Sequence, residues 1–189
     1  AGAKPIAVTE LMPRAAKQSV VLLGESHDSA DDHRWQLQTI AALYAQRAQM
    51  AIAFEAFPRR VQPVLDRWVA GEFTEAQFLK AVDWYRVWNF DPQLYLPLFN
   101  FARINRVPMI AMNVDIALIR SISAKGFAEI PVDAREGVSP PAAASQAYLD
   151  SLFDTYSDHQ PPAIAEHKGK VAPPDRNDPA FKRFVESQQ

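Results

Sequence analysis

Cysteine is absent from this 189-residue sequence, and glycine occurs only 6 times. Without cysteine the chain forms neither disulfides nor thiolate metal sites, which leaves His, Glu, Asp, Tyr and Met as metal ligands. No apolar run approaches the roughly 20 residues of a membrane-spanning helix, and the first residues lack the apolar core of a signal peptide. The net charge of -2 lacks the basic excess of a nucleic-acid-binding protein, so we expect no nucleic-acid partner.

The remaining composition is that of an ordinary globular protein. Apolar residues make up 48% of the chain and charged residues 22%, enough for a substantial core. We therefore expect one domain over residues 1–189. The 15 prolines are concentrated after residue 130, which predicts irregular connections in the last third.

Three short apolar runs are each followed by polar residues, a pattern that predicts a buried strand ending at a turn. Residues 20–23 lead through Gly24 to Glu25 and His27, residues 51–54 lead to Glu55, and residues 109–112 lead to Asn113. Helical segments separate the runs, so we expect parallel strands whose carboxyl ends share one edge of a sheet. Ligands bind at that edge in open parallel sheets. The candidate pocket comprises Glu25, His27, Glu55, Asn113 and Arg120, the last lying one or two turns beyond the third strand.

Helical periodicity and capping residues predict helices between and after these strands. The expected helices lie at about residues 9–17, 31–44, 58–71, 74–83, 95–105, 115–126, 142–158 and 178–189, with residues 160–176 as a loop. Asp31 or Asp32 is expected to cap the second helix, and Thr74 with Gln77 forms a capping box. The predicted fold class is α/β: a parallel sheet flanked by helices, with a helical lobe from about residues 57–95 and 139–189.

The residue types at the strand ends leave three interpretations open. Glu25, His27, His33 and Glu55 can hold a divalent metal such as zinc. Alternatively, His27 is the general base of a hydrolase and Glu25 orients it. In the third interpretation, Glu25 and His27 only fix the turn through hydrogen bonds to the backbone. His33 taken alone is expected on the helix surface or in the first turn of the helix. Two ionised carboxylates at close range need a metal, a guanidinium such as that of Arg120, or a raised pKa.

A second group of candidate residues lies late in the chain. Tyr148, Leu152, Tyr156 and His159 fall on one helical arc, a pattern typical of core packing but also of an apolar wall for haem. His167, Lys168 and Lys170 follow, either as a solvated loop or as partners for haem propionates. Because Tyr148 and Tyr156 are two turns apart, only one can ligate the iron, and we favour Tyr156.

Three stretches of this sequence together resemble the ChaN-type haem-binding lipoproteins of bacterial iron uptake: VVLLGESHD with His33 and Gln36 after it, IAFEAFPRRVQPVLDRWVAGE, and YLPLFNFARINRVPMIAMNVDIALIRSISAKG. The three stretches occur in the same order and at similar intervals in that family, and the resemblance covers most of the chain. It extends to a superfamily with the erythromycin esterases and Tiki-type metalloproteases, which share the Gly-Glu-x-His element at the equivalent strand end.

The resemblance implies a haem-binding protein, not an enzyme, that is exported and lipid-anchored on the periplasmic side of the outer membrane. It also implies a haem-linked homodimer and an outer-membrane haem receptor as partner. The sequence departs from the family in two respects. It has no cysteine for a lipid anchor, and family members continue beyond Gln189, so we expect that this chain is truncated at its C-terminus.

Overall fold

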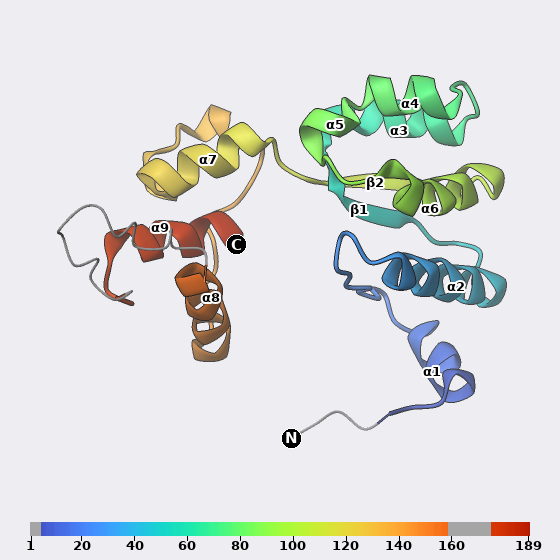
Figure 1. Cartoon of the computed structure of the whole chain (residues 1–189), viewed down its shortest axis with the longest axis horizontal. Coiled ribbons are helices and arrows are strands. Elements are labelled where there is room, and N and C mark those ends of the chain that lie inside the picture. Colours follow the sequence, from blue (N-terminus) through green and yellow to red (C-terminus); the bar gives the residue numbers. More distant parts are fainter. Residues whose placement is uncertain (1–4, 159–174) are drawn as a thin grey trace, which may run out of the picture. The chain divides into compact units, whose positions relative to one another are not determined.

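A computed structural model describes residues 5–158 and 175–189 of the chain. The chain divides into two compact units, Ala1–Asn113 and Val114–Gln189 (Figure 1). Helices dominate both units, and the first also contains a small parallel sheet, so the predicted α/β class is confirmed. The predicted single domain with a helical lobe stays a prediction.

The first unit contains two strands, one 3₁₀ turn and six helices within its described residues: α1 Val8–Ala15, α2 Ala30–Gln46, β1 Ile52–Pro58, η1 Arg59–Val61, α3 Gln62–Val69, α4 Glu75–Ala81, α5 Trp84–Val87, α6 Pro92–Ile104 and β2 Met109–Asn113. The strands β1 and β2 are parallel, with Ile52 opposite Met109 and Phe54 opposite Ala111. The helices between them form the crossover that parallel strands require.

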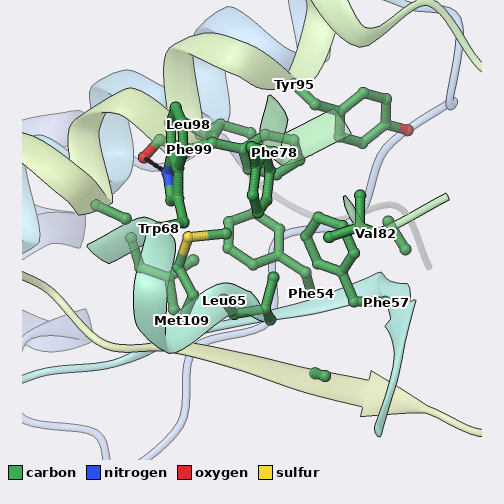
Figure 2. Packing of buried hydrophobic residues seen from close by; sticks show 14 of the residues in the cluster. Phe54, Phe57, Leu65, Trp68, Phe78, Val82, Tyr95, Leu98, Phe99 and Met109 are labelled. Atoms are coloured by element: carbon green, nitrogen blue, oxygen red, sulfur yellow. Dashed lines mark hydrogen bonds between the residues drawn. The ribbon is translucent and has the colours of Figure 1, made fainter. Parts of the chain in front are cut away.

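Aromatic side chains fill the core between one face of this sheet and helices α3 to α6 (Figure 2). Phe99 lies at the centre, with ring contacts to Phe54, Phe57, Phe78 and Trp84 at centroid distances of 5.2 to 5.7 Å. Trp68 is fully buried, and its Nε1 donates a 2.9 Å hydrogen bond to the Phe99 carbonyl. This bond satisfies the one polar atom of a large buried side chain.

The predicted strand at residues 20–23 is wrong, because this segment is not part of the sheet. Val20 is 72% exposed and Leu22 is 86% exposed. The Leu23 carbonyl accepts a 3.0 Å hydrogen bond from Gln36 Nε2 of α2. A side chain of α2 thus donates to a carbonyl that would otherwise accept a hydrogen bond from a neighbouring strand.

Several helix starts also differ from expectation. Helix α3 begins at Gln62, after η1, instead of at about residue 58, and α6 begins at Pro92 instead of at about residue 95. Ser29, not Asp31 or Asp32, is the N-cap of α2, and its hydroxyl accepts from the Asp32 amide. Asp32 instead reaches back and accepts a 2.9 Å hydrogen bond from the Ser26 amide. The helix expected from residue 142 begins at Gln146. Residues 142–145, which follow Pro140 and Pro141, are not helical. The capping box of Thr74 and Gln77 is confirmed.

The second unit consists, in its described residues, of α7 Ile116–Lys125, η2 Phe127–Glu129, η3 Val132–Ala134, α8 Gln146–Asp158 and α9 Pro179–Gln188. Helix α9 packs against both α7 and α8. Glu186 of α9 accepts a 2.7 Å hydrogen bond from the Phe127 amide just beyond the end of α7. Leu152 of α8 packs with Phe181 and Val185 of α9 in a separate small core.

None of the helices in the described ranges has both the length and the apolar composition needed to cross a membrane.

Candidate functional site

Glu25 is the centre of a polar cluster at the end of the segment 20–23. Its Oε1 accepts a 2.6 Å hydrogen bond from the Tyr95 hydroxyl of α6. The same oxygen lies 3.0 Å from His27 Nδ1, and Oε2 lies 3.3 Å from His33 Nδ1 of α2. Two of the three neighbours come from helices that follow Glu25 in the chain, so the cluster is a tertiary feature.

His27 is the member of this cluster that solvent reaches. Its side chain is 36% exposed, and its ring lies edge-on to Trp88, with centroids 4.6 Å apart, and 5.0 Å from Phe90. With Nδ1 donating to the Glu25 carboxylate, the neutral ring carries its lone pair on Nε2. Nε2 makes no hydrogen bond within the described part of the chain.

His33 lies at the end of the first turn of α2, one of its two predicted positions, and it is buried, so the alternative prediction of a helix-surface position is wrong. Its Nε2 donates a 3.2 Å hydrogen bond to the His27 carbonyl. The 3.3 Å approach of Nδ1 to Glu25 is short enough for an ion pair, yet Nδ1 has no hydrogen-bond partner among the described residues. The contact of His33 with the Glu25 carboxylate is therefore electrostatic. His33 shares a face of α2 with Gln36 and Ile40, and this spacing would have predicted its burial.

Three local features bring the cluster together. The Ser29 hydroxyl accepts from the Asp32 amide, and the Asp32 carboxylate accepts from the Ser26 amide; these two bonds start α2 directly after the turn, which directs His33 toward Glu25. The Asp91 cap starts α6 and brings Tyr95 to the opposite side. Asn89 adopts a left-handed conformation with φ of 62°, which Asn tolerates well, between the two residues that contact the His27 ring.

The protonation states of the cluster follow from these contacts. Burial raises the pKa of Glu25, but hydrogen bonds from Tyr95, His27 and Gln36, together with the charge of His33, outweigh burial and hold that pKa below its usual value. Burial and the neighbouring Glu25 raise the pKa of Tyr95 well above its usual value, against a smaller opposite effect of Trp88. At neutral pH, Glu25 is therefore a carboxylate and Tyr95 a phenol that donates to it.

A cleft of about 700 Å³ opens beside this cluster. One wall is a face of α2, another is β1 with the residues before it, and the third is the extended segment before Glu25. Its volume lies within the range of small-molecule sites. His27, Glu25, Tyr95 and Trp88 line the cleft, so the exposed imidazole lies in a concave, largely apolar site.

The remaining candidates, which were predicted to follow strands, are placed differently. Glu55 lies within β1, which continues to Pro58, so its predicted strand-end position is wrong. Glu55 lines the cleft with its side chain exposed, and its negative charge contributes to the raised pKa of Tyr95. Asn113 Nδ2 donates a 3.0 Å hydrogen bond to the Glu55 carbonyl, which ties the end of β2 to the middle of β1. Arg120 is exposed on α7 in the second unit, so its predicted role in the pocket stays a prediction.

No group of three or more His, Asp or Glu side chains that would hold a metal ion occurs among residues 5–158 and 175–189. In the Glu25 cluster the carboxylate oxygens already face Tyr95, His27 and His33. The divalent metal of the sequence analysis therefore stays a prediction.

The candidate haem ligands lie in the second unit. Tyr156 of α8 is half-buried, with its ring 5.3 Å from that of Phe181 and 5.4 Å from that of Phe184. Its hydroxyl makes no hydrogen bond in the described part of the chain, whereas the Tyr148 hydroxyl donates to the Gln188 carbonyl at 3.2 Å. His159, His167, Lys168 and Lys170 lie outside the described residues.

Sequence reasoning missed three residues of the site. Tyr95 was expected only as the start of a helix, and Trp88 and Phe90 only as core filling. Tyr95 shares a helical face with Leu98 and Phe99, which signals burial, but nothing in the sequence pairs its hydroxyl with a carboxylate 70 residues away.

A small α/β unit with a buried carboxylate, an exposed imidazole and an adjacent cleft defines a ligand-binding protein. Residues 11–189 match the protein family described as haem-binding uptake, Tiki superfamily, ChaN, and the chain belongs to this family. A comparison of the chain with curated proteins finds no match, and neither does a comparison with solved structures.

Proposed function

We propose that this protein binds haem on the face of α8, with the phenolate of Tyr156 as the axial ligand of the iron. The family is one of haem-binding uptake proteins. The observation that carries the choice of ligand is the Tyr156 hydroxyl, which lacks a hydrogen bond in the described residues and lies beside the rings of Phe181 and Phe184. Tyr148 would first have to release the Gln188 carbonyl.

This arrangement suits ferric haem chemically. Apolar rings provide the wall that a flat porphyrin needs, and Tyr is an established haem ligand. Ferric iron stabilises the phenolate, so ligation at neutral pH is favourable although a free phenol titrates near pH 10. We propose His167, Lys168 and Lys170 as partners of the propionates because they follow α8 in the sequence.

Haem on one helix face leaves much of the porphyrin in water, and a second protomer would cover it. We therefore propose a haem-linked homodimer. We further propose that the protein acts on the periplasmic side of the outer membrane, with a haem receptor as partner. These proposals rest on the resemblance to haem-binding lipoproteins.

Titration of hemin into the protein tests the ligand assignment. Tyr156→Phe is expected to lose the tyrosinate charge-transfer band and most of the affinity, while Tyr148→Phe retains both. Tyr85→Phe, at an exposed position of the first unit, is the matched control. Hemin should raise the sedimentation coefficient of the wild type. An unchanged spectrum and affinity in both single variants and in the double variant would show that the assignment is wrong.

The Glu25 and His27 pair supports a second candidate function, the hydrolysis of an ester. Glu25 holds His27 Nδ1, which leaves the lone pair of Nε2 in the cleft as a general base. His27 would take a proton from water while the water oxygen attacks the ester carbonyl. The proton then passes to the departing alkoxide, and the products are an acid and an alcohol.

Hydrolysis of 4-nitrophenyl esters tests this candidate. His27→Ala is expected to abolish turnover without changing the affinity for hemin, and Glu25→Gln to lower kcat by about 10-fold to 100-fold because it loses the oriented base. A chelator should leave the rate unchanged if His27 acts without a metal. Equal turnover in wild type and His27→Ala would exclude His27 as the base.

A further inference from the structure

The cleft beside His27 is long and has chemically different ends. Gln36, Ile40 and Leu43 line it from one face of α2, and Arg47, the C-cap residue directly after the helix, lines it eleven residues beyond Gln36. At 1.5 Å per residue, this row spans about 16 Å. At the Gln36 end, the cleft reaches Glu25. A hydrogen bond from Gln36 helps to lower the pKa of Glu25. The cleft therefore extends about three helical turns away from the Glu25 cluster.

The middle of the cleft is apolar. Ile40 and Leu43 of α2 face it from one side, and Ile52 and Phe54 of β1 from another. The extended segment of residues 20–23, all of them aliphatic, completes the lining. A channel of this composition favours a hydrocarbon chain over a sugar or a nucleotide, because it offers few groups that bind hydroxyls or phosphates.

The far end of the cleft carries a positive charge. Arg47 is the only Lys or Arg in the lining, and both lining carboxylates, Glu25 and Glu55, belong to the opposite end. Arg47 is exposed at the end of α2, and its guanidinium forms no ion pair or hydrogen bond within the described ranges. An unpaired guanidinium at the mouth of an apolar channel favours the carboxylate of an amphiphile.

From this arrangement we infer that the cleft binds an elongated, single-chain amphiphile with an anionic head at Arg47 and an ester group at His27. The inference rests on the proposed hydrolase function for the ester group alone. It defines the substrate class as carboxylate-terminated alkyl esters of about the length of the α2 row. Binding of the chain and its head group depends on Arg47 and the apolar walls, and not on catalysis.

Separate measurements of binding and of turnover distinguish the amphiphile site from the proposed hydrolase activity. Isothermal titration with dodecanoate measures the head-group and chain contacts without any reaction. We expect wild type and His27→Ala to bind alike, and Arg47→Gln to bind about fivefold more weakly, the effect of one solvent-screened ion pair. Arg34→Gln is the matched control, because Arg34 is exposed on α2 and does not line the cleft.

The mono-4-nitrophenyl ester of sebacic acid and 4-nitrophenyl decanoate form the substrate pair, since only the first carries a terminal carboxylate. Wild type should prefer the charged ester in kcat/KM, and Arg47→Gln should abolish the preference. Dodecanoate binding that depends on Arg47, without turnover of either ester, would support the amphiphile site and refute the hydrolase. Turnover without a preference for the charged ester, or no binding of dodecanoate, would overturn the inference.

Discussion

The Tyr95 hydroxyl donates a 2.6 Å hydrogen bond to Glu25 Oε1 and so links α6 to a turn 70 residues earlier in the chain. Tyr95 is buried, and Glu25 is largely so. The donor is neutral and the acceptor charged, an arrangement that is stronger than a bond between two neutral groups. The imidazoles of His27 and His33 both approach the carboxylate that this bond holds in place.

Tyr95→Phe is expected to destabilise the first unit by about 1.5–3 kcal/mol, the value for hydrogen bonds to charged groups. The phenyl ring keeps the contacts with His33 and Phe99, so the loss reflects the missing hydroxyl. Urea unfolding followed by tryptophan fluorescence measures it, because all four tryptophans lie in this unit. Tyr85→Phe at an exposed position should change nothing. Equal losses in both variants would contradict the assigned bond.

Phe99→Ala tests the aromatic core and should cost about 3–5 kcal/mol, as large-to-small changes at buried aromatic positions do. Phe99 is fully buried and contacts rings from β1, α4 and α5. Ile104→Ala at the exposed end of α6 is the control and should stay within about 0.5 kcal/mol of the wild type. A Phe99→Ala cost below about 1 kcal/mol would mean that the core closes over the cavity or is not packed as described.

Glu186→Ala should loosen the second unit and leave the first intact. Glu186 accepts the Phe127 amide at 2.7 Å, and its loss leaves a half-buried donor without a partner, at a cost of about 1–3 kcal/mol. Far-UV circular dichroism should show earlier loss of helix, while tryptophan fluorescence, which reports only the first unit, follows the wild-type curve. Glu129→Ala at an exposed position of η2 is the control. If the circular dichroism and fluorescence curves of Glu186→Ala shifted equally, the expectation that only the second unit is destabilised would be wrong.

Local patterns predicted much of this fold. The capping box at Thr74 needs only residues within one helical turn, and the sequence therefore specifies it completely. The run ending at Asn113 gave the correct strand, since it pairs with another apolar run across a helical crossover. At residues 20–23 the same kind of pattern failed. There a distant side chain, Gln36, binds the backbone, and a local pattern contains no information about that contact.

The candidate site was predictable only in part. Glu25 and His27 are two residues apart and do interact, as their spacing and polarity suggested. Tyr95, Trp88 and Phe90 reach them through the packing of α5 and α6, which depends on the whole core. A hydrogen bond across 70 residues has no periodicity, so no pattern of residue types predicts it.

The stability of the first unit is expected to depend on pH through Glu25. Hydrogen bonds hold the pKa of Glu25 in the folded chain below its usual 4.5 despite the opposing effect of burial, so on acidification the unfolded chain binds the proton first. The stabilisation from the ionised carboxylate is therefore complete above about pH 4.5 and is lost as the pH falls through the folded pKa.

Glu25→Gln cannot titrate, and so it isolates this effect. Its deficit in the free energy of unfolding relative to wild type should be largest near pH 7 and smaller near about pH 3, where the unfolded wild-type chain binds a proton at this carboxyl group. Urea unfolding at both pH values, followed by tryptophan fluorescence, gives the two differences. Glu72→Gln, at an exposed carboxylate of the same unit, corrects for the general effect of removing a negative charge. A Glu25→Gln deficit that is the same at both pH values would mean that Glu25 is not held as a carboxylate by Tyr95 and His27.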